Sequence, residues 1–290
     1  MIPADLPLSA WAALRPAIPP PDGAALAPNV WRLGDEVLKR FPQSDLARFR
    51  RIVRAHRQAG RIFRGCKGLA AQRLLGFDEN HRALLLGFVP GRSGRQALEW
   101  VAPEAILAGA GAWLRVFHAG RETGEGRLDP LGALARLPRR LVCAEAEGYS
   151  AALGALHREA EQLQGRRVRR ACLHGDMTLA NLVFHAGGVT GIDFENLRRH
   201  PAERDIGELW ADLLLHVPGL PSAAGLMPET WESAFALAYP ALTPEVAAFY
   251  TRHRLLKVWA AIPPDPSRRG PRRDRQLRNL GALRARGGLG

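Results

Sequence analysis

The first ninety residues alternate short apolar runs with turn residues, a pattern typical of β-strands. Four runs are dominated by β-branched, aromatic and leucine side chains. The strands that these runs predict span residues 29–33, 36–41, 69–75 and 83–89. A Gly34-Asp35 turn separates the first two and predicts a β-hairpin, while Pro90 ends the last run.

Helical periodicity appears once before residue 90 and dominates after residue 95, because apolar residues there recur at intervals of three and four. The predicted helices span about 46–59, 104–118, 143–164, 203–215, 229–238 and 244–262. Ser44 or Asp45 is placed to cap the first helix, and Gly60 is placed to end it. Residues 120–132 are rich in glycine and charge, which predicts an exposed connection.

One further hairpin is predicted inside the helical half. Two short apolar runs, 182–184 and 189–192, flank a Gly-Gly turn and lead into Asp193. The resulting order is a loop, a strand, a tight turn and a second strand, which brings Asp176, Asn181 and Asp193 to one rim. Three oxygen-bearing side chains at one rim are what Mg²⁺ and a transferred phosphoryl group require.

The order of elements predicts the fold class. A β-rich part followed by an α-rich part with one embedded hairpin indicates an α+β protein with two lobes and a cleft between them. We expect a small β-rich N-terminal lobe over 1–90 and a larger, mainly helical lobe over 91–266. Residues 267–290 are expected to form a polar, basic tail.

Composition narrows the class of protein. Apolar residues make up 47% of the 290 positions, which is enough for a sizeable core. The three cysteines, Cys66, Cys143 and Cys172, are widely spaced and match neither a zinc site nor a set of disulfides, so we expect a reducing compartment. No apolar run reaches the ~18 residues of a membrane span, and no signal-peptide pattern opens the chain. The expected location is cytoplasmic, with no transmembrane segment.

The net charge of +13 is unevenly distributed. Residues 267–290 hold eight arginines and one aspartate, and therefore contribute +7. The whole chain has 38 arginines but only three lysines, which indicates a compositional bias and gives each lysine more weight. No aromatic interleaving or recognition motif accompanies the basic tail, so no nucleic-acid partner is expected.

The motif His174-Gly-Asp176-x-x-x-x-Asn181, followed by Ile192-Asp193-Phe194-Glu195, resembles the catalytic core of the aminoglycoside phosphotransferase family, which includes choline kinase-like enzymes. The resemblance implies a bilobal protein-kinase-like fold. It also implies a small-molecule kinase, a transferase that uses ATP or GTP with Mg²⁺ to phosphorylate an alcohol group of a small hydroxylated substrate. The first lobe would bind the nucleotide, and the second would carry catalysis and the acceptor.

The resemblance implies a role for each motif residue. Asp176 matches the catalytic base, and its main contribution is expected to be positioning of the acceptor hydroxyl, since an ordinary aspartate is a weak base at neutral pH. His174 matches a residue that supports the catalytic loop through hydrogen bonds. Asn181 and Asp193 match the two magnesium ligands. The alternative for Asp176, Asn181 and Asp193 is a local cap or turn former.

The nucleotide-binding residues are also implied by the resemblance. Lys39 matches a lysine that reaches the α- and β-phosphates of ATP. The family normally holds this lysine with a glutamate on the next helix, but the only acid near that helix is Asp45, so the partner of Lys39 stays open. The end of the 83–89 strand resembles the hinge between lobes, where backbone groups of Gly87, Phe88 and Val89 would bind adenine.

The charge of the acceptor stays open. Residues 203–245 hold seven acids and one base, which favours a cationic aminoglycoside-like or amino-alcohol acceptor. Arginines at 166–170 and 198–199 favour an anionic sugar or a lipid-linked acceptor instead, and either cluster is equally explained as solvated surface. A catalytically weakened kinase-fold protein with a binding or regulatory role is a further alternative, supported by the missing helix glutamate.

Overall fold

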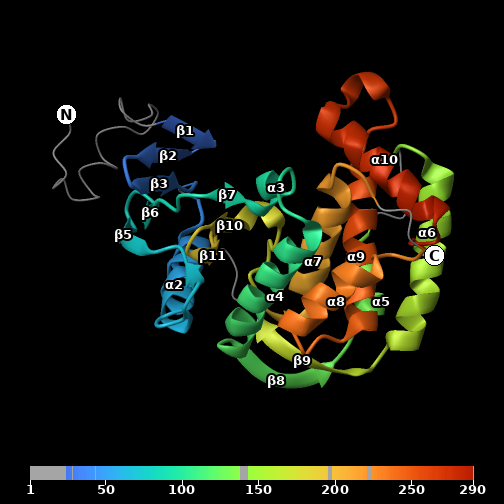
Figure 1. Ribbon diagram of the computed structural model, residues 1–290, viewed down its shortest axis with the longest axis horizontal. Helices are drawn as coiled ribbons and strands as arrows, with labels where there is room; N and C mark the ends of the chain where they lie inside the picture. Colours follow the sequence, from blue (N-terminus) through green and yellow to red (C-terminus); the bar gives the residue numbers. More distant parts are fainter. Residues whose placement is uncertain are drawn as a thin grey trace.

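The computed structural model describes residues 24–27, 29–42, 44–137, 143–194, 198–220 and 224–289. Strands dominate the N-terminal part and helices the C-terminal part, so the chain is an α+β protein, as predicted (Figure 1). The lead-in over 1–23 and Glu195 of the catalytic motif lie outside the described residues. The predicted domain boundaries stay a prediction.

The N-terminal sheet has five antiparallel strands in the order β1-β2-β3-β6-β5. Its strands are β1 (Ala24–Ala27), β2 (Val30–Leu33), β3 (Glu36–Arg40), β5 (Leu74–Asp78) and β6 (Ala83–Gly87). The hairpin of β2 and β3 confirms the prediction from the Gly34-Asp35 turn. Gly34 has a φ of 60°, a left-handed conformation that glycine adopts at little cost.

Helix α2 (Leu46–Ile62) packs its apolar face against this sheet through Phe49 and Ile52. Asp45 caps the helix by accepting a hydrogen bond from the Arg48 N–H at 2.7 Å, as the sequence indicated. The helix passes through Gly60, so the predicted end was wrong. The helix ends at Ile62, and the following residue, Phe63, is buried against the core.

A second sheet joins the two halves of the chain, with strand order β4-β11-β10-β7. Its strands are β4 (Leu69–Ala71), β7 (Arg92–Ser93), β10 (Leu182–His185) and β11 (Gly188–Gly191). The antiparallel pairing of β10 with β11 confirms the embedded hairpin. Because β4 pairs in parallel with β11, the hairpin is fixed against the N-terminal part. The single strand predicted over 69–75 is divided into β4 and β5 at Gln72.

Helices form the larger part of the structure (Figure 1). They are α3 (Gly94–Ala97), α4 (Pro103–Ala119), α5 (Pro130–Leu134), α6 (Ala146–Leu163), α7 (Glu203–His216), α8 (Glu229–Ala238), α9 (Pro244–Trp259) and α10 (Pro271–Ala285), with 3₁₀ turns η1 (Leu179–Asn181) and η2 (Pro266–Arg268). Helix α7 packs along α9, and α4 packs along α8. None of the helices in the described part of the chain is long and apolar enough to cross a membrane.

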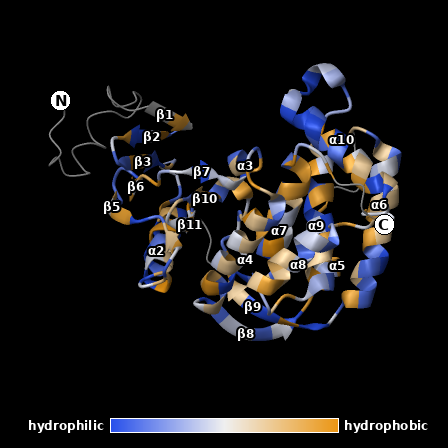
Figure 2. Ribbon diagram, in the orientation of Figure 1, coloured by the Kyte–Doolittle hydropathy of each residue, from blue (hydrophilic) through white to orange (hydrophobic). Residues whose placement is uncertain are grey.

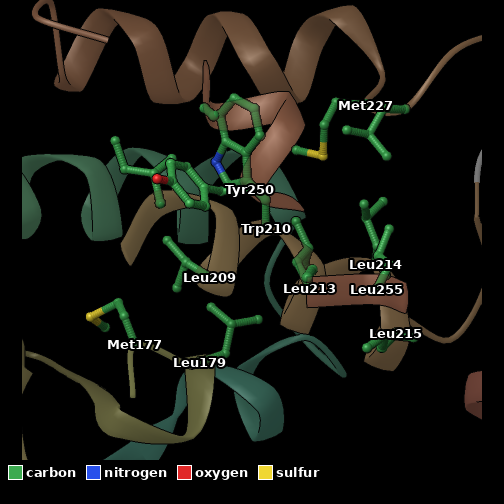
Figure 3. Packing of buried hydrophobic residues seen from close by; sticks show 14 of the residues in the cluster. Met177, Leu179, Leu209, Trp210, Leu213, Leu214, Leu215, Met227, Tyr250 and Leu255 are labelled. Carbon is green, nitrogen blue, oxygen red and sulfur yellow. The ribbon is translucent and has the colours of Figure 1, made fainter. Parts of the chain in front are cut away.

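The core centres on α7, where Leu209, Trp210 and Leu213 lie against α9 residues such as Tyr250 and Leu255 (Figure 3). Figure 2 shows the same distribution at the level of whole elements, with hydrophobic residues on α7 and α8 and hydrophilic residues along α2. An almost fully buried α7 gives the protein a rigid element on which a site can be built.

A third sheet was missed by the sequence analysis. Strands β8 (Glu122–Arg127), β9 (Arg167–Cys172) and β12 (Arg199–Pro201) pair in the order β12-β9-β8. The segment 120–132 was expected to be an exposed connection, and most side chains of β8 are indeed exposed. The strand forms because its backbone pairs with β9, and an exposed edge strand carries no apolar alternation that a sequence could reveal.

The segment 267–290 does not form the tail that was expected. Leu280 and Leu283 of α10 are fully buried against the helical core. The Asn279 Nδ2 donates a hydrogen bond of 2.8 Å to the Leu214 carbonyl of α7. The expectation was wrong because the arginines on the outer face of α10 dominate its composition. The narrow stripe of apolar residues on the inner face is not apparent from the composition.

We expect Leu280→Ala to lower the free energy of unfolding by about 2 to 5 kcal/mol, because it leaves a cavity beneath α10. Urea unfolding measures the change. The matched control is Arg278→Ala on the exposed face of the same helix, with an expected change within about 0.5 kcal/mol. Equal, small effects of the two substitutions would mean that α10 is an accessory tail after all.

Candidate active site

The loop between β9 and η1 carries His174, Gly175 and Asp176. Its backbone N–H groups are held by a buried carboxylate of α7. Asp205 accepts hydrogen bonds from the N–H of His174 at 2.7 Å and of Gly175 at 3.1 Å, and it also bonds the His118 ring at 3.1 Å. Burial alone would raise the pKa of Asp205, but the His118 and backbone donors lower it overall. The carboxylate therefore stays ionised and fixes the start of the loop.

A second carboxylate of α7 fixes the end of the same loop. The Leu179 N–H donates to Asp212 at 3.0 Å, and Asp212 also forms an ion pair with Arg95 of α3. Burial opposes ionisation of Asp212, but the hydrogen bonds from His216 and Arg95 lower its pKa to about 2. Asp205 and Asp212 are seven residues apart, or about two helical turns, so both face the loop.

Apolar packing supports the same arrangement. Met177 and Leu179 of the loop are fully buried beside Leu209 of α7 (Figure 3). Asp176 directly precedes the buried Met177 and keeps its side chain 59% exposed. The loop thus presents one carboxylate to solvent while its neighbours are fixed.

The three predicted site residues of the catalytic stretch do converge. The Asn181 Nδ2 donates to the Asp176 carbonyl at 2.7 Å, and the Asn181 carbonyl accepts from the Ile192 N–H at 2.9 Å. The His174 ring lies 2.9 Å from the Ile192 carbonyl, so Ile192 is held on both sides. The next residue, Asp193, is therefore fixed beside Asn181. His174 is buried, and its ring contact with Ile192 is consistent with the predicted role in supporting the loop.

Lys39 reaches this stretch from the N-terminal sheet, and its Nζ forms an ion pair with Asp193. This answers the question of the missing helix glutamate in part, because Asp45 caps α2 and Asp193 offers a carboxylate to the lysine. Asp193 has a φ of 64°, a left-handed conformation that is uncommon for residues other than glycine and that occurs at functional sites.

Asn181 and Asp193 form a donor set that suits Mg²⁺. An amide oxygen and a carboxylate are hard ligands, and Mg²⁺ characteristically keeps several waters and completes its coordination with phosphate oxygens. The sequence predicted these two residues as metal ligands, and the hydrogen bond from the Ile192 N–H to the Asn181 carbonyl brings their segments of the chain together. Their role as ligands stays a prediction.

A cavity of about 250 Å³ lies between the N-terminal sheet and this stretch. Its walls are mainly apolar, and Lys39 and Asp193 line it as well. The lining residues are Leu26, Val30, Val37, Lys39, Gln72, Leu86, Phe88, Val89, Val183, Ile192 and Asp193. Apolar walls with charged groups suit a planar base joined to phosphates.

The predicted hinge lies in this cavity, but part of its backbone is already bonded. The Gly87 N–H donates to the Arg73 carbonyl at 2.8 Å, and the Phe88 N–H donates to the Asp35 carbonyl at 2.8 Å. Neither N–H is therefore available to a nucleotide. In the part of the chain that the structure describes, the Val89 N–H has no hydrogen-bond partner. Of the three backbone N–H groups in the predicted hinge, it is therefore the one available to a nucleotide.

An aromatic column connects α2 to the catalytic loop. The His56 and His174 rings each lie 5.2 Å from the Phe194 ring, and Trp113 stacks beside them at 6.2 Å from Phe194. A Cβ at Gly191 would lie 2.1 Å from the Trp113 ring, which explains the glycine. The column connects α2 to Phe194, the residue that follows Asp193, so the two are positioned together.

His56 occupies a site that the sequence gave no reason to single out. It is 1% exposed, and neither ring nitrogen has a hydrogen-bond partner among the described residues. Burial, opposed by Asp193 and reinforced by Lys39 and His174, lowers the pKa of His56 from 6.5 to about 4. The ring is therefore neutral at physiological pH and acts as part of the core.

Arg254 of α9 is a site residue that the sequence analysis missed. Its Nη2 lies 4.0 Å from the Asp176 Oδ1. Glu208 of α7 faces the same region, and burial, with the charge of Asp205, raises the pKa of Glu208 to about 7 despite Arg254 and Arg204. No pattern distinguishes Arg254 among 38 arginines, so only the fold could identify it.

Many residues of the two charge clusters considered for the acceptor are buried or bind other parts of the protein. Of the acids over 203–245, Asp205 and Asp212 hold the catalytic loop and Glu203 is buried. Of the arginines near β9, those at 166, 167 and 169 form surface ion pairs with glutamates. Among the described residues, Arg254 lies 4.0 Å from the Asp176 carboxylate, and Glu208 of the acidic cluster is close enough for the charge of Asp176 to act on it.

A family model described as the phosphotransferase enzyme family matches residues 17–232, most of the chain. The chain belongs to this family. This confirms the resemblance drawn from the catalytic motif. The match includes Lys39, the predicted hinge, the catalytic loop and α7. No curated protein sequence matches the chain.

Solved structures similar to this phosphotransferase share its kinase-like fold. A choline/ethanolamine kinase family protein from Mesorhizobium loti has 15% identity and a TM-score of 0.56, over 95% of this chain and 93% of its own. A glucosamine kinase in complex with glucosamine, ADP and phosphate has 15% identity and a TM-score of 0.57, over 96% and 85%. An aminoglycoside phosphotransferase from Streptomyces rimosus, with ADP and streptomycin, has 18% identity and a TM-score of 0.52, over 87% and 99%.

We expect Asp205→Asn to lower the free energy of unfolding by about 3 to 5 kcal/mol, because the amide group cannot accept all the N–H donors of a buried carboxylate. Hydrogen exchange at His174 and Gly175 should accelerate at the same time, since their N–H groups lose their acceptor. The control is Glu203→Gln, a buried acid of the same helix with no hydrogen bond to the loop. Matching exchange profiles in the two variants would contradict the role of Asp205.

We expect His56→Phe to reduce the loss of stability at acidic pH. Between pH 6.5 and 4 the unfolded chain binds a proton at His56 that the folded protein excludes, so the stability present above pH 6.5 is lost as the pH falls towards 4. The variant should gain about 3 kcal/mol relative to the wild type by pH 4, because one pKa unit corresponds to about 1.4 kcal/mol.

Urea unfolding at a series of pH values measures this difference. Ile52→Val, on the same buried face of α2 and without an ionisable group, should run parallel to the wild type. The two other histidines with a lowered pKa, His200 and His253, contribute equally to all three proteins. A His56→Phe curve that also runs parallel to the wild type would refute the assignment.

Proposed function

We propose that this phosphotransferase is an ATP- and Mg²⁺-dependent kinase that transfers the γ-phosphate to a hydroxyl group of a small molecule. The observation that carries the proposal is the convergence of Asp176, Asn181, Asp193 and Lys39 beside one apolar cavity. Two structures with the same fold hold ADP, together with glucosamine in one and streptomycin in the other, which supports a nucleotide-dependent reaction.

In the proposed reaction, Asp176 accepts a hydrogen bond from the acceptor hydroxyl and aims its oxygen at the γ-phosphorus. A bond forms between the acceptor oxygen and the γ-phosphorus, and the bond from the γ-phosphorus to the bridging oxygen breaks. The hydroxyl proton passes to Asp176, and ADP carries away the electron pair of the broken bond. The anchoring of the loop by Asp205 and Asp212 supports this positioning role.

The phosphate groups are bound by residues from both lobes. Lys39 pairs with the α- and β-phosphates, and Asn181 and Asp193 would hold the metal. Mg²⁺ held by these two residues would neutralise part of the charge of the phosphate groups. The ion pair between Lys39 and Asp193 argues against a catalytically weakened protein, because the lysine has a carboxylate partner although α2 carries no acid.

Arg254 favours a second candidate, a kinase for an acceptor with an acidic group. A guanidinium 4.0 Å from the proposed base would attract a carboxylate or phosphate beside the reacting hydroxyl. Glu208 opposes this attraction only in its ionised form, and its pKa near 7 keeps it partly protonated. The acceptor panel used to test the proposal should therefore include hydroxylated acids and sugar phosphates as well as amino sugars and amino alcohols.

We expect ATP with Mg²⁺ to raise the melting temperature of the wild type, and one class of hydroxylated acceptor to stimulate ADP release. Asp176→Asn should retain ATP binding while lowering kcat on the order of 10²- to 10⁴-fold, because positioning and proton acceptance are lost. Asp193→Asn should lose the Mg²⁺-dependent part of the thermal shift. Coupled detection of ADP measures turnover.

Glu229→Gln, an exposed acid of α8, is the control and should leave both readouts unchanged. Absence of any thermal shift with ATP or GTP would refute nucleotide binding. Nucleotide binding without ADP release across all acceptor classes would instead favour the binding or regulatory role. Wild-type turnover in Asp176→Asn would show that the reaction, if present, does not use this carboxylate.

A further inference from the structure

The cavity contains one polar side chain whose role the proposed function does not explain. Gln72, between β4 and β5, lines the cavity and is 7% exposed. Its backbone N–H donates to the Gly191 carbonyl at 2.8 Å, and its Nε2 donates to the Gly87 carbonyl at 3.0 Å. A buried amide in a mainly apolar cavity usually makes a specific hydrogen bond.

The register of the sheet places Gln72 at the end of the cavity away from the phosphates. Lys39 pairs with Leu84, whereas Gly87, which binds Gln72, pairs with Glu36. Three residues along a strand correspond to about 10 Å. If Lys39 binds the phosphates, a base in the same cavity lies near Gly87, Val89 and Gln72.

The orientation of the Gln72 amide is fixed by Gly87. Turning the amide over would place its oxygen against the Gly87 carbonyl oxygen, so two acceptors would face each other. The hydrogen bond therefore keeps Nε2 on Gly87 and leaves Oε1 as an acceptor. In the part of the chain that the structure describes, Oε1 has no hydrogen-bond partner.

These groups form a pattern that distinguishes purines. The amino group at carbon 6 of adenine donates hydrogen bonds, whereas the oxygen at that position in guanine and hypoxanthine accepts them. The Gly87 carbonyl and the Gln72 Oε1 are acceptors, and the Val89 N–H is a donor that suits the unprotonated N1 of adenine. An oxo group at carbon 6 would face two acceptors instead.

We propose that Gln72 reads the substituent at carbon 6 of the purine and makes this cavity select ATP over inosine and guanosine triphosphates. The inference rests on the proposed function, since it requires a purine nucleotide in the cavity. It assigns a specificity-determining side chain on the segment between β4 and β5, outside the hinge that the sequence analysis identified.

The test compares ATP with inosine triphosphate, whose base differs from adenine only at carbon 6 and in the proton at N1. Titration calorimetry with Mg²⁺ and no acceptor gives both dissociation constants. We expect the wild type to bind ATP about tenfold or more tightly. Gln72→Met should reduce this preference by about fivefold or more, because methionine has a similar shape and no amide.

Two further variants separate base reading from structural support. Gln72→Glu replaces the Nε2 donor with a second oxygen that faces the Gly87 carbonyl, so the side chain loses its anchor and the preference for ATP should fall as it does in Gln72→Met. Val183→Ala, in another wall of the same cavity, should weaken both nucleotides equally and leave the ratio unchanged. If Gln72→Met also weakens both nucleotides equally, Gln72 only joins Gly191 to Gly87, and the inference is overturned.

The remaining outcomes are also decisive. A wild type that binds inosine triphosphate as tightly as ATP would overturn the inference and leave the proposed kinase activity intact. A wild type that binds neither nucleotide would overturn the proposed function itself and this inference with it. Guanosine triphosphate, which carries the same oxo group, should follow inosine triphosphate in every variant.

Discussion

The catalytic loop keeps its conformation because two buried carboxylates of α7 bind its backbone. Asp205 holds the N–H groups at the start of the loop and Asp212 holds the N–H of Leu179 at its end. Buried carboxylates are costly unless their oxygens are satisfied, and here backbone donors, His118 and Arg95 satisfy them. The free energy of these contacts exists only when the loop and α7 are both in place, so the geometry of the site and the packing of the lobe are coupled.

This coupling extends outwards from α7. The helix packs along α9, which brings Arg254 to Asp176, and α10 covers it through Leu280 and Asn279. On the other side, the column of His56, Phe194 and His174 joins the loop to the helix of the N-terminal sheet. The two lobes therefore contact each other through aromatic packing at Phe194, the residue after Asp193. A change in the position of α2 would shift Phe194 and with it Asp193, the proposed metal ligand.

The sequence revealed the parts of this site that are local. The spacing from Asp176 to Asn181 and the Gly-Gly hairpin predicted side chains at one rim, because a loop and a tight hairpin bring nearby residues together. Arg254 and Gln72 could not be found in this way, because each reaches the site through contacts between residues distant in the chain. His56 was hidden for a different reason. On α2 it follows the same helical spacing as the apolar core residues, and its surroundings are set by β-strands and by Phe194.

The missing acid on α2 changes the electrostatics of the site. Ile52 and His56 form the buried face of the helix here, and His56 is neutral at physiological pH because burial lowers its pKa to about 4. Helix α2 therefore offers Lys39 an uncharged surface, and the carboxylate of Asp193 lies on the cavity side. Because the carboxylate partner of Lys39 lies on the cavity side, the positive charge of the lysine points to the place where phosphates would bind. In this arrangement Asp193 would bind both Lys39 and the metal. If Asp193 releases one of these two partners, a phosphate oxygen of the nucleotide would take its place.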